Sequence, residues 1–83
     1  MEELRSEWAK AAAAALTKEK GDIYSSGQVA KIVGLSASRI YEDIVEGWLT
    51  AADVGRPGPG RKSLWRIARA DVENYIKRVD ARQ

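Results

Sequence analysis

A chain of 83 residues is long enough for one small domain, near the size at which a single hydrophobic core only just suffices. It contains no cysteine and no histidine, which excludes disulfides, thiolate metal sites and histidine-based catalysis, so we expect a protein that is not an enzyme and needs no cofactor or metal. The net charge is only +2, and no apolar run approaches the ~20 residues of a membrane span, so we expect a cytoplasmic protein without a membrane partner.

The first predicted element is an alanine-rich helix over residues 2–20, followed by Gly21 as a candidate C-terminal cap. Its apolar positions share one face at helical spacing: Leu4, Trp8, Ala11, Ala12, Ala15 and Leu16. Two roles are open for this segment, residues 1–21. It either covers the core of the domain or joins copies of the chain through Leu4, Trp8, Ala12 and Leu16.

Two short helices are predicted next, within about 25–47. Ser25 and Gln28 have the spacing of a capping box, Gly34 ends the first helix, and Ser36 is a natural N-cap for the second. In the second helix we expect the apolar side to hold Ala37, Ile40, Tyr41, Ile44, Val45 and Trp48. The opposite, solvated side is expected to hold Ser38, Arg39, Glu42, Asp43 and Glu46.

Two strand candidates, residues 49–54 and 63–67, flank the Gly/Pro-rich stretch 55–62 and are expected to pair with each other. A final helix is predicted over about 69–79, because Val72, Tyr75, Ile76 and Val79 recur at i, i+3, i+4 and i+7. The expected fold is therefore mainly α with a small β-hairpin.

Positive charge is concentrated in one part of the chain. Residues 54–70 carry five basic side chains and no acid, whereas residues 21–53 carry five acids against two bases. Such a run is either a solvated surface or a contact for a polyanion such as nucleic acid. The stretch 55–62 is likewise either a linker or a basic loop tip.

The spacing of Ala30, Gly34 and Ile40 suits two helices joined by a tight turn, because it supplies a small contact residue, a glycine for the turn and an apolar anchor. With the hairpin that follows, residues 24–77 resemble the small winged helix-turn-helix DNA-binding domains of the excisionase-like and MerR-type group. The matching motifs are Val29-Ala30, Gly34-Leu35-Ser36, Ile40-Tyr41, Gly47-x-Leu49, Val54-Gly55-Arg56, Trp65-Arg66-Ile67 and Asp71-Val72.

The resemblance implies a winged helix-turn-helix domain over 22–80, preceded by the extra N-terminal helix. Within it, the helix-turn-helix would span about 25–47, the wing hairpin about 49–67 and the C-terminal helix about 69–79. It also implies sequence-specific binding of double-stranded DNA, with the second helix in the major groove and the wing on the minor groove or backbone. The implied DNA-binding residues are Lys31, Ser36, Ser38, Arg39, Glu42, Arg56, Arg61, Lys62 and Arg66.

Several of these roles have alternatives. Arg39 would either pair with a guanine or hold a phosphate. Ser36 would cap its helix with or without touching DNA, and Glu42 would either accept a hydrogen bond from cytosine or remain solvated.

The expected biological role is that of an excisionase-type recombination factor or a transcriptional regulator associated with the nucleoid, with a recombinase or another protein as a candidate partner. One alternative is the DNA-recognition domain of a phage small terminase subunit. The other is a protein-interaction module that uses the acidic second helix. Within the resemblance, nothing in the residues separates the DNA-binding roles.

Overall fold

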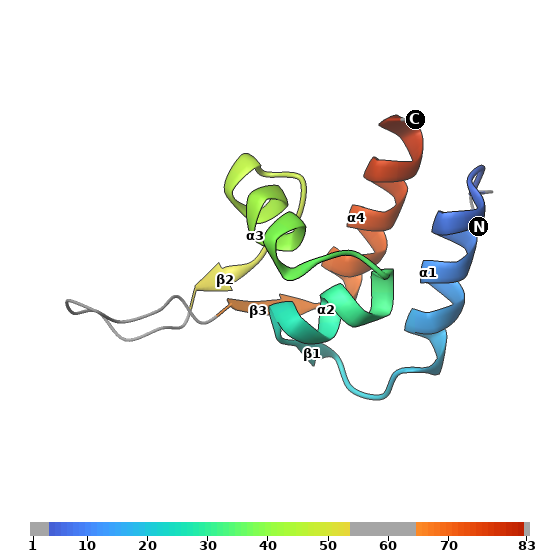
Figure 1. The fold of residues 1–83 in the computed structure, drawn as a ribbon. Coiled ribbons are helices and arrows are strands. Elements are labelled where there is room, and N and C mark those ends of the chain that lie inside the picture. Colours follow the sequence, from blue (N-terminus) through green and yellow to red (C-terminus); the bar gives the residue numbers. More distant parts are fainter. Residues whose placement is uncertain (1–3, 54–64, 83) are drawn as a thin grey trace.

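The computed structural model describes residues 4–53 and 65–82 (Figure 1). Over this part of the chain the fold is mainly helical with a small antiparallel sheet, which confirms the expected class. In chain order the elements are α1 (Glu7–Lys18), β1 (Ile23–Tyr24), α2 (Ser26–Val33), α3 (Ala37–Glu46), β2 (Ala52–Asp53), β3 (Trp65–Ala68) and α4 (Arg69–Arg82). None of the helices within the described ranges is long and apolar enough to cross a membrane.

The sheet has the strand order β1-β3-β2, and both outer strands run antiparallel to β3. Ala52 of β2 lies opposite Arg66 of β3, which confirms the expected pairing of residues 49–54 with 63–67. Strand β1 was not predicted, because two residues are too few to show an alternating pattern. It pairs Tyr24 with Ile67 and thereby joins the start of the helical region to the sheet.

The hydrophobic core draws on all four helices and on the sheet. Its buried members are Ala9, Ala12, Leu16, Tyr24, Val29, Ala30, Ile32, Val33, Ile40, Leu49, Ile67, Val72, Tyr75, Ile76 and Val79. Every apolar position expected to face inward from the last helix is among them, which confirms that periodicity. Helix α4 continues to Arg82, three residues beyond its predicted end.

The predicted bounds of the first helix, residues 2–20, are wrong for the part that the structure describes. Helix α1 begins at Glu7, because the side chain of Ser6 acts as its N-cap and accepts a hydrogen bond from the backbone N–H of Ala9 at 3.0 Å. It ends at Lys18, where Glu19 takes an extended conformation. Gly21 therefore follows the helix and does not cap it.

Helix α1 is packed into the core of its own chain. Ala12 and Leu16 are buried, whereas Ala11, which was expected beside them, is exposed because the inward face is centred on Ala9 instead. The indole N–H of Trp8 donates to the carbonyl oxygen of Val33 at 2.6 Å and ties α1 to the end of α2.

The packing of α1 involves the same face that the sequence offered for contact between copies of the chain. Ala12 and Leu16 are covered by the chain itself, and Leu4 and Trp8 are half-buried against the same core. The structure thus confirms that this helix covers the core of the domain, and contact between copies through the same helix stays a prediction.

Two side chains of α4 hold the two ends of α1, which runs antiparallel to it (Figure 1). The carboxylate of Asp80 accepts hydrogen bonds from the backbone N–H groups of Arg5 and Ser6, both at 2.8 Å. At the other end, the guanidinium of Arg69 donates to the carbonyl oxygen of Leu16 at 2.9 Å and to that of Glu19. An anion at the N-terminus and a cation at the C-terminus both complement the helix dipole and satisfy unpaired backbone groups.

The Asp80 contact makes stability depend on pH. The hydrogen bonds from Arg5 and then Ser6 hold the pKa of Asp80 below its ordinary value. Because the folded pKa is depressed, this stabilisation is fully present above the unfolded pKa of about 3.9 and is lost as the pH falls through the folded pKa. We expect Asp80→Asn to lower Tm at neutral pH and to flatten the fall of Tm on acidification.

Thermal unfolding followed by circular dichroism between about pH 7 and about pH 2 measures this effect. Glu73→Gln, at an exposed position of the same helix, is the matched control and should change neither quantity. If the Tm of Asp80→Asn fell on acidification as steeply as that of the wild type, Asp80 would not be the source of the pH dependence.

Candidate functional site

The connection between α2 and α3 is built from short-range hydrogen bonds. The side chain of Ser25 accepts the backbone N–H of Gln28 at 3.2 Å, and the side chain of Gln28 accepts the backbone N–H of Ser25 at 2.8 Å, so the predicted capping box is confirmed. Gly34 ends α2 with φ of 68°, a left-handed conformation that glycine adopts without strain. The turn therefore fixes where α3 starts relative to α2.

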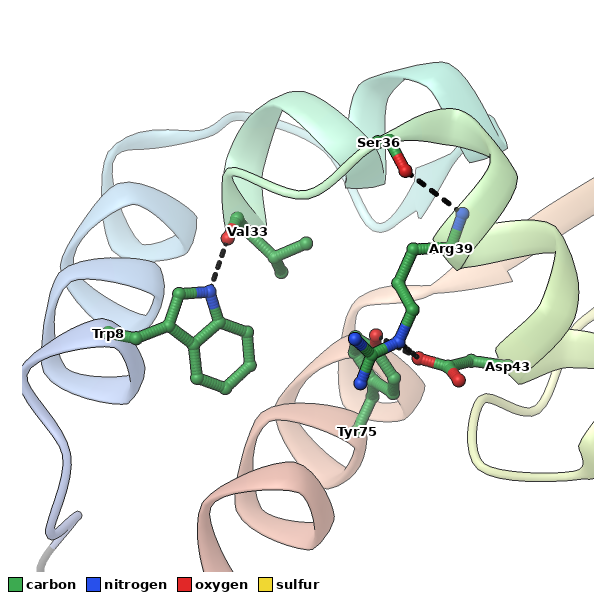
Figure 2. Close-up of polar contacts among 6 residues, drawn as sticks. All are labelled: Trp8, Val33, Ser36, Arg39, Asp43 and Tyr75. Atoms are coloured by element: carbon green, nitrogen blue, oxygen red, sulfur yellow. Dashed lines mark hydrogen bonds and ion pairs between the residues drawn. The ribbon is translucent and has the colours of Figure 1, made fainter. Parts of the chain in front are cut away.

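Helix α3 begins where the sequence predicts. The Oγ atom of Ser36 accepts the backbone N–H of Arg39 at 3.1 Å, which confirms Ser36 as the N-cap (Figure 2). The same residue is exposed, so capping leaves its hydroxyl at the surface.

The inward face of α3 differs from the predicted one. Ile40 and Asp43 are 0% and 2% exposed, and Ile44 is half-buried. Tyr41 and Val45, which were expected on the apolar side, are 54% and 65% exposed. The helix is thus rotated so that a carboxylate, predicted to be solvated, faces the core.

A buried polar network explains this rotation (Figure 2). The Nε atom of Arg39 lies 3.1 Å from the Oδ2 atom of Asp43, and the hydroxyl of Tyr75 on α4 donates a hydrogen bond to the same oxygen. Burial is tolerated because the carboxylate has both a cation and a donor as partners. The network fastens α3 to α4 on the side that faces away from solvent.

The protonation state of Tyr75 suits this role. Burial raises the pKa of its hydroxyl, and the hydrogen bond to Asp43 raises it further. Tyr75 therefore stays protonated at neutral pH and keeps donating to the carboxylate.

The exposed side of α3, called the outer face below, consists of Ser38, Tyr41, Glu42, Val45 and Glu46. Ser38, Glu42 and Val45 lie at i, i+4 and i+7, opposite Ile40 and Asp43. Two of the residues predicted to contact DNA, Ser38 and Glu42, are thereby brought together on one surface. Arg39 lies at its edge, with a side chain 40% exposed and directed toward Asp43.

The remaining predicted site residues lie on other elements. Lys31 is exposed in the last turn of α2, and Arg66 is exposed on β3. Arg56, Arg61 and Lys62 lie outside the described residues. The structure therefore assigns positions to six of the nine predicted residues, and three of those six are on α3.

Comparison with protein-family models, with curated proteins and with solved structures returned no match. What this surface does must therefore be argued from its own chemistry.

Three residues of α3 differ from their expected placement: Asp43 is buried, and Tyr41 and Val45 are exposed. The i, i+4 spacing of Arg39 and Asp43 was an available signal for their ion pair. No comparable signal existed for the exposure of Tyr41 and Val45, because an apolar residue beside an apolar face is ordinarily assigned to that face.

Proposed function

We propose that the chain is a winged helix-turn-helix protein that binds double-stranded DNA, with α3 as its recognition helix. The observation that carries this proposal is how α3 is held. Its inward face is fastened by Ile40 and by the Asp43 network, while its N-terminal turn and outer face are exposed. A helix presented in this way fits the major groove of B-DNA, which is about 12 Å wide. Helix-turn-helix proteins contact base edges with the N-terminal part of that helix.

The side chains on and near α3 divide between phosphate and base contacts in this proposal. Ser36 and Ser38 stand at the N-terminal turn, where a hydroxyl can donate to a phosphate or a base. Lys31 and Arg39 contact phosphates from either side of the turn. Glu42 is the one carboxylate in the centre of the outer face and accepts a hydrogen bond from the amino group of cytosine.

The outer face itself contributes little attraction for DNA. It carries Glu42 and Glu46 and no cation, so its charge repels phosphates. In the proposal the attraction comes from the basic segment 54–70, which includes Arg66 on β3 and the predicted wing residues Arg56, Arg61 and Lys62. Affinity and sequence reading are therefore supplied by different parts of the chain.

The wing assignment is tested by replacing Arg56, Arg61 and Lys62 with alanine. We expect weaker binding to duplex DNA and a salt dependence whose slope falls by about one for each phosphate contact removed. Fluorescence anisotropy at several salt concentrations measures both quantities, and circular dichroism verifies that the variant is folded.

A matched control separates a specific contact from net charge. Replacing the three exposed lysines Lys18, Lys20 and Lys77 with alanine removes the same charge from other surfaces. The wing assignment would be abandoned if this variant lost as much affinity and slope as the wing variant.

The proposal as a whole is tested by selection from a pool of random duplexes at near-physiological salt, followed by footprinting on the enriched site. DNA binding predicts enrichment of a defined sequence, and the footprint shows how copies are arranged on it. The candidate roles are a recombination factor, a transcriptional regulator and the DNA-recognition domain of a small terminase subunit. A pool that shows no enrichment would rule the proposal out.

A second candidate function has one observation in its favour. Tyr41 and Val45 expose apolar surface beside the acidic residues Glu42 and Glu46, a combination that also suits a protein partner with a basic groove. Retention of a protein partner by the wild type and its loss on replacing Glu46, without any duplex binding, would favour this function over the first.

A further inference from the structure

The outer face of α3 has an unusual composition for a surface proposed to lie against bases. Tyr41 and Val45 are two of the three large hydrophobic side chains that are exposed within the described residues, and they stand one helical turn apart. Glu42 lies beside them on the same face. The nearest cation on the helix, Arg39, is directed toward the buried carboxylate of Asp43.

The four bases present different groups in the major groove. Guanine offers two acceptors, which arginine or lysine recognises by donating hydrogen bonds. Thymine offers its 5-methyl group, which is recognised by apolar contact, and cytosine offers an amino donor. The outer face has apolar partners for the methyl group of thymine and an acceptor for the amino group of cytosine, and it carries no arginine or lysine for guanine.

The ion pair between Arg39 and Asp43 bears on whether Arg39 is available to guanine. The Nε–H of Arg39 donates to Asp43 at 3.1 Å and directs the side chain toward the buried carboxylate. Releasing the side chain would leave a buried carboxylate with Tyr75 as its remaining partner, which is costly. A guanine contact that required Arg39 to turn away from Asp43 would thus compete with the bond that fastens α3.

We propose that α3 recognises thymine through its 5-methyl group, with Tyr41 and Val45 as the residues that determine specificity. This inference rests on the proposed function, since it requires α3 to lie in the major groove. It gives the two exposed apolar side chains a defined ligand, and it predicts a site whose α3-facing bases include thymine.

The test compares thymine with deoxyuridine, which lacks only the 5-methyl group. Each thymine of the duplex enriched by selection is replaced in turn, and the Kd of the wild-type protein is measured by fluorescence anisotropy. Because burial of one methyl-sized group is worth about a fourfold change in Kd, we expect binding to weaken about fourfold at each thymine that α3 contacts.

The variants Val45→Ala and Tyr41→Ala assign that effect to side chains. Each should bind the thymine and deoxyuridine versions of its own contact equally, while keeping the discrimination at the other thymine. Ile23→Ala is the matched control, because Ile23 is a comparably exposed apolar residue, at 57%, on β1. It should retain the full discrimination at every position.

The outcomes distinguish the inference from the function on which it rests. Two results would overturn thymine reading and leave DNA binding standing. One is equal binding of thymine and deoxyuridine at all positions, and the other is that both α3 variants keep the full discrimination at every thymine. An enriched site without thymine opposite α3 would do the same. A pool without enrichment would remove the proposed function and this inference together.

Discussion

Replacing Asp43 with alanine is expected to lower the free energy of unfolding by about 2 kcal/mol, because the buried hydroxyl of Tyr75 loses its acceptor. A buried donor without a partner is penalised more heavily than an average hydrogen bond, since its interaction with water has been given up and nothing replaces it. Arg39 adds less to the loss, because its side chain is 40% exposed and regains hydration. Urea denaturation at neutral pH measures the change.

Two further variants make the Asp43 prediction specific. Glu42→Ala removes the adjacent carboxylate, which is exposed on the same helix, and should change stability by no more than about 0.5 kcal/mol. The double variant Asp43→Ala/Tyr75→Phe should recover part of the loss, because neither partner is then left unsatisfied. If Asp43→Ala and Glu42→Ala proved equally mild, the network would have no structural role.

The second large effect is expected at Ile40, the apolar anchor of α3. Ile40→Ala should destabilise the domain by about 2 to 5 kcal/mol, because the side chain is fully buried and its removal leaves a cavity. In a domain of this size that corresponds to a fall in Tm of roughly 10 °C or more. Thermal unfolding followed by circular dichroism measures it.

Val45 provides the matched control for Ile40, since both are branched apolar residues of α3 and differ in exposure. Val45→Ala should leave Tm almost unchanged, because the side chain is 65% exposed. Its effect is expected on DNA binding instead. A large loss of stability in Val45→Ala would show that the outer face is covered in solution, and it would contradict the proposed orientation of α3.

These effects connect the stability of the domain with its proposed activity. The same network that holds Asp43 inside also sets the rotation of α3, and thereby decides that Ser38, Glu42 and Val45 face outward. Loss of Asp43 should therefore weaken DNA binding even at temperatures where the variant is folded. In such a protein, the residues that position a recognition helix and the residues that read bases lie on opposite sides of one helix.

Features whose cause lies within a few residues along the chain could be predicted from the amino-acid sequence. The capping box of Ser25 and Gln28, the left-handed turn at Gly34 and the N-cap at Ser36 all depend on partners three or four positions away. The periodicity of α4 is local in the same sense. Such signals are readable because the chain geometry already brings the interacting groups together.

Features that depend on partners distant along the chain could not be predicted and are seen only in the folded protein. Asp80 holds the start of α1 across 74 residues, Arg69 holds its end across 53, and Tyr75 draws Asp43 inward across 32. Hydropathy assigns a lone carboxylate to the surface, because its burial is favourable only when a specific donor from another element is present. The orientation of α3, and with it the identity of its outer face, follows from that long-range partner.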